Sequence, residues 1–81
     1  MEAPLTERIQ TLLADVFKVP VQEVTPDLAM GDLPQWDSIG HMDVMLSLEQ
    51  KFGVEITTEA IGELVSIPAI CTYLMDKSNH D

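Results

Sequence analysis

The chain has 81 residues, the size of one small domain, and 46% of them are hydrophobic, which argues against intrinsic disorder. Its 14 acidic residues outnumber 4 basic ones, and the net charge is −10. A surface of this sign repels phosphate backbones and anionic membranes, so we expect no nucleic-acid partner and an attraction to proteins with basic patches.

The first residues and the single cysteine bear on the compartment. Met1–Pro4 has neither the basic region nor the hydrophobic core of a secretion signal. Cys71 has no second cysteine for an intrachain disulfide, and no apolar run approaches the ~20 residues of a membrane-spanning helix. We therefore expect a monomeric, cytoplasmic protein with no membrane span.

The first helical segment runs from about Pro4 to Val19, because apolar residues recur there at spacings of three and four. Pro20 is expected to end it. The stretch from Pro20 to Trp36 has turn signals, a possible short turn near Val21 and no long periodic segment. Its apolar residues are spaced so that they could pin it to the core, which predicts a long ordered loop; they are Val21, Val24, Leu28, Leu33 and Trp36.

A second helix is predicted over about Ser38 to Phe52. Pro34 disfavours helix before it, and both Asp37 and Ser38 are good N-cap residues. Gly53 is a plausible C-cap. At about 100° per residue, the apolar residues on one side form a core stripe, namely Val44, Met45, Leu48 and Phe52.

The opposite side of this helix also carries large apolar residues, Ile39, Met42 and Leu46. Fully burying one such side chain contributes roughly 1.5–3 kcal/mol, so three left outside suggest a surface that meets a partner. The alternative is that single exposed apolar residues are common on protein surfaces and need no partner. Asp43 and Glu49 lie around the three apolar residues.

The remaining chain predicts an extended connector over Val54–Ile56, a short helix over about Glu59–Leu64 and a last helix capped by Ser66. Thr57 or Thr58 can cap the short helix. The inner stripe of the last helix comprises Ile67, Ile70, Cys71 and Leu74, which makes Cys71 a buried apolar residue. We expect an all-α bundle of three main helices and one short helix, forming one domain over residues 1–81, with frayed ends at 1–3 and 78–81 and a polar tail from Asp76.

The sequence resembles the acyl and peptidyl carrier proteins over nearly its whole length. The resemblance is carried by Asp37-Ser38-Ile39, by the following run Leu48–Ile56 and by the order and spacing of the other segments. Ile39 stands where the family usually has leucine. Residues 33–36, Leu-Pro-Gln-Trp, differ from the leucine and glycine of many fatty-acid carriers, and Trp-Asp-Ser-x-Gly-His is more similar to freestanding carriers of specialised pathways.

The resemblance implies that a transferase attaches 4′-phosphopantetheine from coenzyme A to Ser38. The thiol of that arm then holds acyl groups as thioesters for enzymes of fatty-acid, polyketide or related biosynthesis, and the domain itself is no enzyme. The implied partners are the phosphopantetheinyl transferase and acyl-activating ligases, synthases or acyltransferases with basic docking patches. Fatty-acyl, polyketide, amino-acyl and D-alanyl carriers share the fold and the serine.

The family motif also gives the neighbouring residues roles. Asp37 is expected to cap the helix and, by resemblance, to help the transferase orient coenzyme A and its magnesium ion. Trp36, Ile39 and His41 support the motif, with Trp36 packing the loop end and His41 bracing the loop or lying beside the root of the arm. The expected docking face consists of Ile39, Met42 and Leu46, ringed by Asp43, Glu49 and Glu55.

The same residues are compatible with other functions. Ser38 could be a plain N-cap. A hydrolase built on Asp37, Ser38 and His41 is disfavoured, because the first two are sequence neighbours and no third group orients the histidine. The loop acids lack the spacing of a calcium loop, so no metal site is expected. The rival function is an acidic helical interaction module without a prosthetic group.

Overall fold

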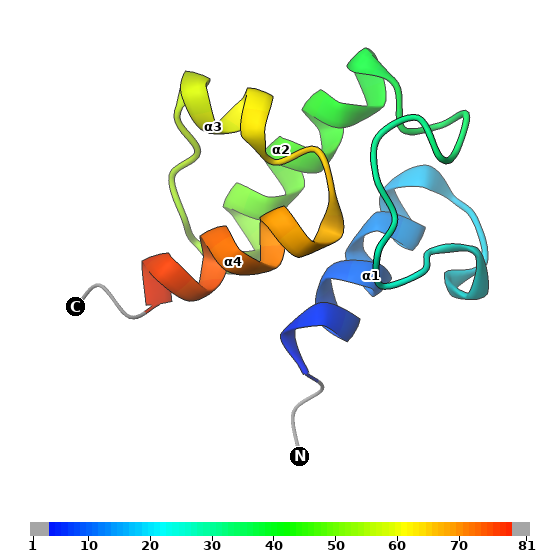
Figure 1. Ribbon diagram of the computed structural model, residues 1–81, viewed down its shortest axis with the longest axis horizontal. Helices are drawn as coiled ribbons and strands as arrows, with labels where there is room; N and C mark the ends of the chain where they lie inside the picture. The colour runs from blue at the N-terminus through cyan, green and yellow to red at the C-terminus, as the bar shows by residue number, and fades with distance from the viewer. Residues whose placement is uncertain (1–3, 79–81) are drawn as a thin grey trace.

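The computed structural model describes residues 4–78 and is drawn in Figure 1. Three longer helices and one short helix follow in order, with one turn of 3₁₀ helix in the long loop. They are α1 (Leu5–Phe17), η1 (Val21–Glu23), α2 (Ser38–Phe52), α3 (Thr58–Glu63) and α4 (Ile67–Ser78). The predicted all-α bundle is confirmed, and its helices fall where the sequence pattern placed them.

The core lies between α1, α2 and α4, and α1 packs against both of the others. The predicted stripe of α2 points inward: Val44 and Leu48 are fully buried, Met45 is nearly so and Phe52 is half-buried at the edge. The stripes that meet it are Ile9, Leu12, Leu13 and Phe17 from α1 and Ile67, Ile70 and Leu74 from α4. Since each such side chain contributes roughly 1.5–3 kcal/mol on burial, these contacts set the positions of the helices.

Two helices, α1 and α3, differ from the prediction in their ends. The first helix ends at Phe17, two residues earlier than expected, because Lys18 takes a left-handed conformation with φ 59°. Pro20 disfavours helical backbone at the residue before it, Val19, which explains why the helix ends early. The short helix begins one residue earlier than expected, at Thr58, with the Thr57 side chain accepting from the Ala60 amide at 3.1 Å.

The long loop from Lys18 to Asp37 lies on one side of the bundle, beside α1 and the start of α2 (Figure 1). Val24, Leu28 and Trp36 are buried and Leu33 is half-buried, as predicted for an ordered loop. Val21 was predicted to help pin the loop, and this was wrong. It is 45% exposed, because the 3₁₀ turn that it begins has no buried residue.

Backbone hydrogen bonds tie this loop to the segment between α3 and α4. Ala29 and Ser66 form an isolated antiparallel bridge. The amide of Met30 donates to the carbonyl of Val65 at 2.8 Å, and the amide of Ile67 donates to the carbonyl of Leu28 at 2.9 Å. The loop is therefore joined to residues 65–67 before and at the start of α4, as well as to α2, which follows it.

The second half of the chain follows the prediction in its caps and connector. The Ser66 hydroxyl accepts from the Ala69 amide at 3.2 Å, and Gly53 ends α2 with φ 65°. Val54 and Ile56 pack half-buried against the core.

The structure corrects two predictions, the burial of Cys71 and the end of the last helix. Cys71 is half-buried rather than buried, because it sits at the edge of the α1–α4 contact, with its Sγ 3.7 Å from Oγ1 of Thr6 and 3.9 Å from Sδ of Met75. Ser78, expected to belong to the frayed end, is instead the last residue of α4, so the polar tail from Asp76 begins as helix. The predicted frayed residues 1–3 and 79–81 lie outside the described part of the chain.

Candidate functional site

The candidate site is the junction between the long loop and α2. Ser38 is the first residue of α2, and its side chain is exposed. Asp37 precedes it in extended conformation, and its Oδ1 accepts from the Gly40 amide at 2.8 Å. The Asp37 carbonyl accepts from the His41 amide at 2.8 Å and so begins the helix. Asp37 is thus the N-cap, as expected, and Ser38 presents its hydroxyl outside the bundle.

Gly40 has a role that the sequence analysis missed, because there it only weakened the prediction of a helix. A Cβ atom built on Gly40 would overlap the backbone carbonyl oxygen of Gln35. The loop therefore crosses the first turn of α2 closely enough that only glycine fits beneath it. This close approach sets the direction in which the chain enters Asp37 and Ser38.

Trp36 and His41 hold the loop end from inside the bundle. Trp36 is fully buried and packs against Phe17, with ring centroids 5.9 Å apart. Its Nε1–H donates to Nδ1 of His41 at 3.0 Å. Since Nδ1 accepts, the ring proton lies on Nε2, which donates to the carbonyl of Ile61 at 2.7 Å. Trp36 thus packs the loop end, as expected, and of the two positions expected for His41 the structure shows the one that braces the loop.

These contacts also remove the hydrolase alternative. His41 is only 4% exposed, and its two ring nitrogens are occupied by Trp36 and by Ile61 of α3. A catalytic base must reach the hydroxyl that it activates, and a buried, doubly bonded imidazole is not arranged to do so. His41 is a structural link between the loop, α2 and α3.

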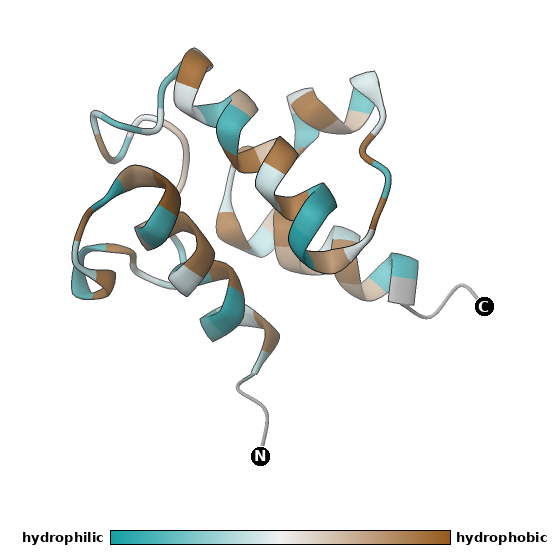
Figure 2. Ribbon diagram, turned by 180° about the vertical axis from the view of Figure 1, so that it is seen from behind, coloured by the Kyte–Doolittle hydropathy of each residue, from teal (hydrophilic) through white to brown (hydrophobic). Residues whose placement is uncertain are grey.

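The outer face of α2 carries the exposed apolar residues that the helical pattern predicted. Ile39 is 79% exposed, Leu46 54% and Met42 46%. In Figure 2 the ribbon of α2 crosses in front of the bundle, and hydrophobic and hydrophilic segments alternate along it. An isolated exposed leucine needs no explanation, but three large apolar residues on one helix face form a patch. We call these three residues the α2 face.

The acids expected around the α2 face differ in their surroundings. Asp43 and Glu55 are exposed. Glu49 is half-buried, and its Oε2 accepts from the amide of Ile56 at 3.0 Å. Glu49 therefore also anchors the connector after α2, which the sequence analysis did not foresee.

The acids of the long loop serve local turns. Oδ1 of Asp27 accepts from the Thr25 hydroxyl at 2.9 Å, and Oδ2 of Asp32 accepts from the Ala29 amide at 2.9 Å. Among residues 4–78 no group of three or more histidine, cysteine or acidic side chains could hold a metal ion. Within the same residues, none of the helices has the length and apolar character needed to cross a bilayer.

The junction suits a phosphate ester on the Ser38 hydroxyl. The first backbone amides of an α-helix have no acceptor within the helix. In α2 the Gly40 amide donates to Asp37, and the amides of Ser38 and Ile39 lie in the same first turn. The positive end of the helix dipole favours an anion there by roughly 0.3–1 kcal/mol. The exposure of Ser38 and of Ile39 beside it leaves room for a long pendant group.

Comparisons with known proteins relate the sequence of the chain to one family. Residues 7–74 match the model of a family described as "Phosphopantetheine attachment site". The chain is 32% identical over 72 residues to an acyl carrier protein of Helicobacter pylori (strain G27), a match that covers 89% of this chain and 92% of the relative. It is 24% identical over 76 residues to the acyl carrier protein of Thermosynechococcus vestitus, covering 94% of each, and 25% identical over 73 residues to that of Thermobifida fusca, covering 90% and 92%.

Proposed function

The chain belongs to the phosphopantetheine attachment-site family, and on that premise we propose that it holds acyl intermediates on an arm attached to Ser38. It is a carrier protein with covalently attached 4′-phosphopantetheine, like the acyl carrier proteins that it resembles. This family membership disfavours the alternative of an interaction module without a prosthetic group. When attached, the arm supplies a terminal thiol on which acyl groups are held as thioesters.

The observation that carries the assignment of Ser38 is its position. Ser38 is an exposed hydroxyl at the first turn of a long helix, directly after the aspartate that caps that helix. The loop before it is held by Trp36 in the core and by the close approach of Gln35 to Gly40. These contacts give the hydroxyl a fixed position on the surface, where a transferase can reach it.

Asp37 is proposed to serve both the fold and the loading reaction. Its Oδ1 holds the Gly40 amide, which keeps the carboxylate next to Ser38. By resemblance to the family, that carboxylate helps the transferase to orient coenzyme A and a magnesium ion. The capping role alone requires only an oxygen acceptor, whereas the second role requires the negative charge.

Partner enzymes are proposed to dock on the α2 face, next to the loaded serine. Ile39, Met42 and Leu46 supply exposed apolar surface, and Asp43 and Glu55 supply negative charge near it. Apolar patches with basic rims on the partners would complement this face. The proposed partners are a phosphopantetheinyl transferase and the ligases, synthases or acyltransferases of fatty-acid, polyketide or related biosynthesis. We place these encounters in the cytoplasm, where Cys71 remains a thiol.

The test is the intact mass of the protein after incubation with coenzyme A and a phosphopantetheinyl transferase of broad specificity. Wild type is expected to gain the mass of one phosphopantetheine group. Ser38→Ala should gain none while keeping the helical circular dichroism of the wild type. Ser47→Ala, a matched change in the middle of α2, should still be loaded. Loading of Ser38→Ala to the wild-type extent would refute the assignment of the site.

A further inference from the structure

Met42 lies in the middle of the α2 face, one helical turn from the serine proposed to carry the arm. Ile39 precedes it by three residues and Leu46 follows it by four, which puts the three side chains at neighbouring positions of one helix surface. Ser38 lies four residues before Met42, so their Cβ atoms are roughly 5–6 Å apart. Because long side chains of a helix lean toward its N-terminus, the side chain of Met42 covers the surface beside Ser38.

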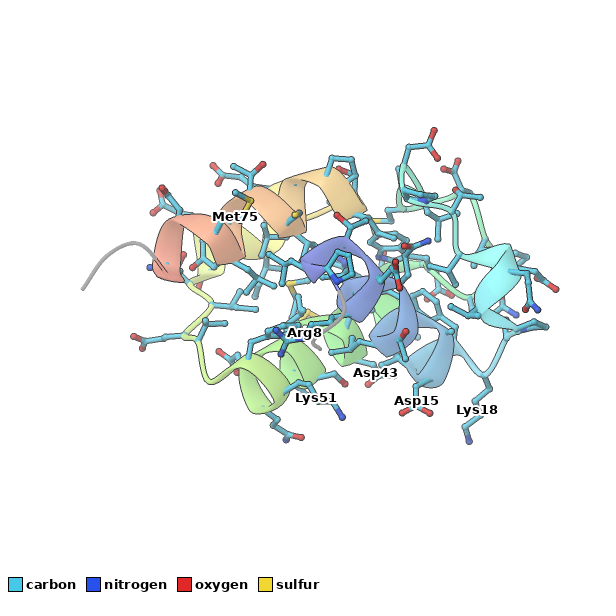
Figure 3. All side chains as sticks on the ribbon, turned by 90° about the horizontal axis from the view of Figure 1, so that it is seen from below. Arg8, Asp15, Lys18, Asp43, Lys51 and Met75 are labelled. Carbon is cyan, nitrogen blue, oxygen red and sulfur yellow. The ribbon has the colours of Figure 1, made fainter. Side chains whose placement is uncertain are left out.

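The methionines of the chain differ in their access to solvent. Met42 is 46% exposed, whereas Met45, on the other side of the same helix, is 3% exposed. Met30 is half-buried and packs against the core, and Met75 is 52% exposed. Figure 3 shows Met75 on α4, apart from the residues labelled on α2. Among residues 4–78 the exposed methionines therefore lie at two separate places, and of these Met42 alone belongs to the α2 face.

An exposed methionine reacts with peroxides, and the product is far more polar than the thioether. The thioether sulfur takes one oxygen atom from hydrogen peroxide: the O–O bond breaks, a sulfoxide forms, the sulfur is oxidised by two electrons and the peroxide is reduced to water. The sulfoxide oxygen is a hydrogen-bond acceptor, and covering it with an apolar patch that offers no donor is unfavourable. Oxidation of Met42 therefore makes the middle of an apolar surface polar.

We propose that Met42 is a reversible oxidation site that controls docking on the α2 face. Its thioether lets a partner enzyme cover the surface beside Ser38, and its sulfoxide hinders that contact until a methionine sulfoxide reductase restores the thioether. This inference rests on the proposed function, because it requires that the enzymes which act on Ser38 dock on the α2 face. It goes beyond that function by naming a modification, its oxidant and the side chain that receives the oxygen.

Exposure alone does not single out Met42, because single exposed apolar side chains are common on protein surfaces. Its position does, since it lies one turn from Ser38 and between two other exposed apolar residues. Ile39 and Leu46 have no sulfur, so Met42 is the one side chain of the α2 face that peroxide converts to a sulfoxide. Met75 has similar exposure on another helix and provides a comparison within the same chain.

The test measures loading of the protein without its arm by a phosphopantetheinyl transferase, before and after treatment with hydrogen peroxide. Dithiothreitol follows the peroxide, because it reverses disulfide and sulfenic acid formation at Cys71 and leaves methionine sulfoxide in place. Peptide mass mapping should find the added oxygen on Met42 and Met75 before Met45. We expect kcat/KM for loading of wild type to fall by roughly three- to tenfold, as for the loss of one apolar anchor at an interface, with the helical circular dichroism unchanged.

Two variants assign the effect to one sulfur. The ratio of kcat/KM after peroxide to that before it is compared within each protein, so that the effect of the substitution itself cancels. Met42→Leu removes the sulfur from the α2 face and should give a ratio close to one. Met75→Leu removes the other exposed methionine and should show the same loss as wild type. Methionine sulfoxide reductases for both sulfoxide epimers should restore loading of oxidised wild type.

Several outcomes would overturn the proposal. Wild type that carries sulfoxide at Met42 and is loaded as fast as before would refute it while leaving the carrier function intact. An equal loss in Met42→Leu would assign the effect to another side chain, and loss of the helical signal after peroxide would assign it to the fold. Failure of the reductases to restore loading would refute reversible control. Wild type that is not loaded even before peroxide would refute the carrier function and this proposal with it.

Discussion

The indole Nε1–H of Trp36 donates a 3.0 Å hydrogen bond to Nδ1 of His41, and both residues are buried. This bond joins the end of the long loop to the first turns of α2. Through Nε2 of His41 it continues to the carbonyl of Ile61 in α3. One imidazole therefore connects the loop end, α2 and α3 around the start of α2.

Replacing His41 with phenylalanine should destabilise the protein by about 1–3 kcal/mol, because it leaves the buried indole N–H of Trp36 and the carbonyl of Ile61 without partners. Urea unfolding followed by circular dichroism measures this loss. Trp36→Phe and the double variant complete a double-mutant cycle, for which a coupling of about 1 kcal/mol is expected. Additive effects would show that the bond contributes no stability of its own.

Gly40→Ala should lower stability by about 1–3 kcal/mol, although alanine has the better helix propensity, because the added Cβ overlaps the Gln35 carbonyl. Gly62→Ala in α3 is the matched control, since a Cβ there meets nothing within 4 Å. That variant should gain about 0.4–1 kcal/mol. Thermal unfolding of the two variants compares them, and the idea fails if Gly40→Ala is the more stable.

The two proposed roles of Asp37 can be separated by substitution. Asp37→Asn keeps an oxygen for the Gly40 amide and should leave stability nearly unchanged, while Asp37→Ala should cost about 0.5–2 kcal/mol. If the charge serves the loading reaction, both variants should be loaded more slowly by the transferase. Mass-spectrometric loading rates are compared with chemical unfolding of the same samples. Wild-type loading of Asp37→Asn would limit Asp37 to capping.

Serine substitutions at Ile39 and Leu46 should lower kcat/KM for loading without lowering stability, since these side chains are 79% and 54% exposed. The expected reduction is about tenfold for the pair, as for exposed apolar anchors at an interface. Leu48→Ala, on the buried side of the same helix, should instead cost about 2–5 kcal/mol of stability. Unchanged loading of the serine pair would show that the transferase docks elsewhere.

Most of the fold followed from periodicity and capping. The two faces of α2 could be separated because Val44 and Leu48 fall opposite Ile39 and Leu46 at the angle of a helix, and the structure buries the first pair and exposes the second. Likewise, Ser66 caps α4 as its sequence context predicted. Helical periodicity and capping residues are local patterns, so they can be read from the sequence even when the contacts between segments are unknown.

The features that the sequence did not predict depend on contacts between different segments, some of them near neighbours along the chain. Nothing in the spacing of Trp36, His41 and Ile61 shows that an indole and a backbone carbonyl meet the same imidazole. The requirement for glycine at position 40 arises from a loop folding back over the helix. Val21 was misplaced because an apolar residue in an irregular segment has no period from which its direction can be inferred.

The pairing of Ala29 with Ser66 has a mechanical consequence. Together with the polypeptide between them, it closes a loop of chain that contains Ser38, all of α2 and all of α3. The bonds of Met30 to Val65 and of Leu28 to Ile67 therefore join the loop that leads into Ser38 to the chain that follows α3. The smallest helix is thus connected to the neighbourhood of the serine in two ways, through the side chain of His41 and through the backbone.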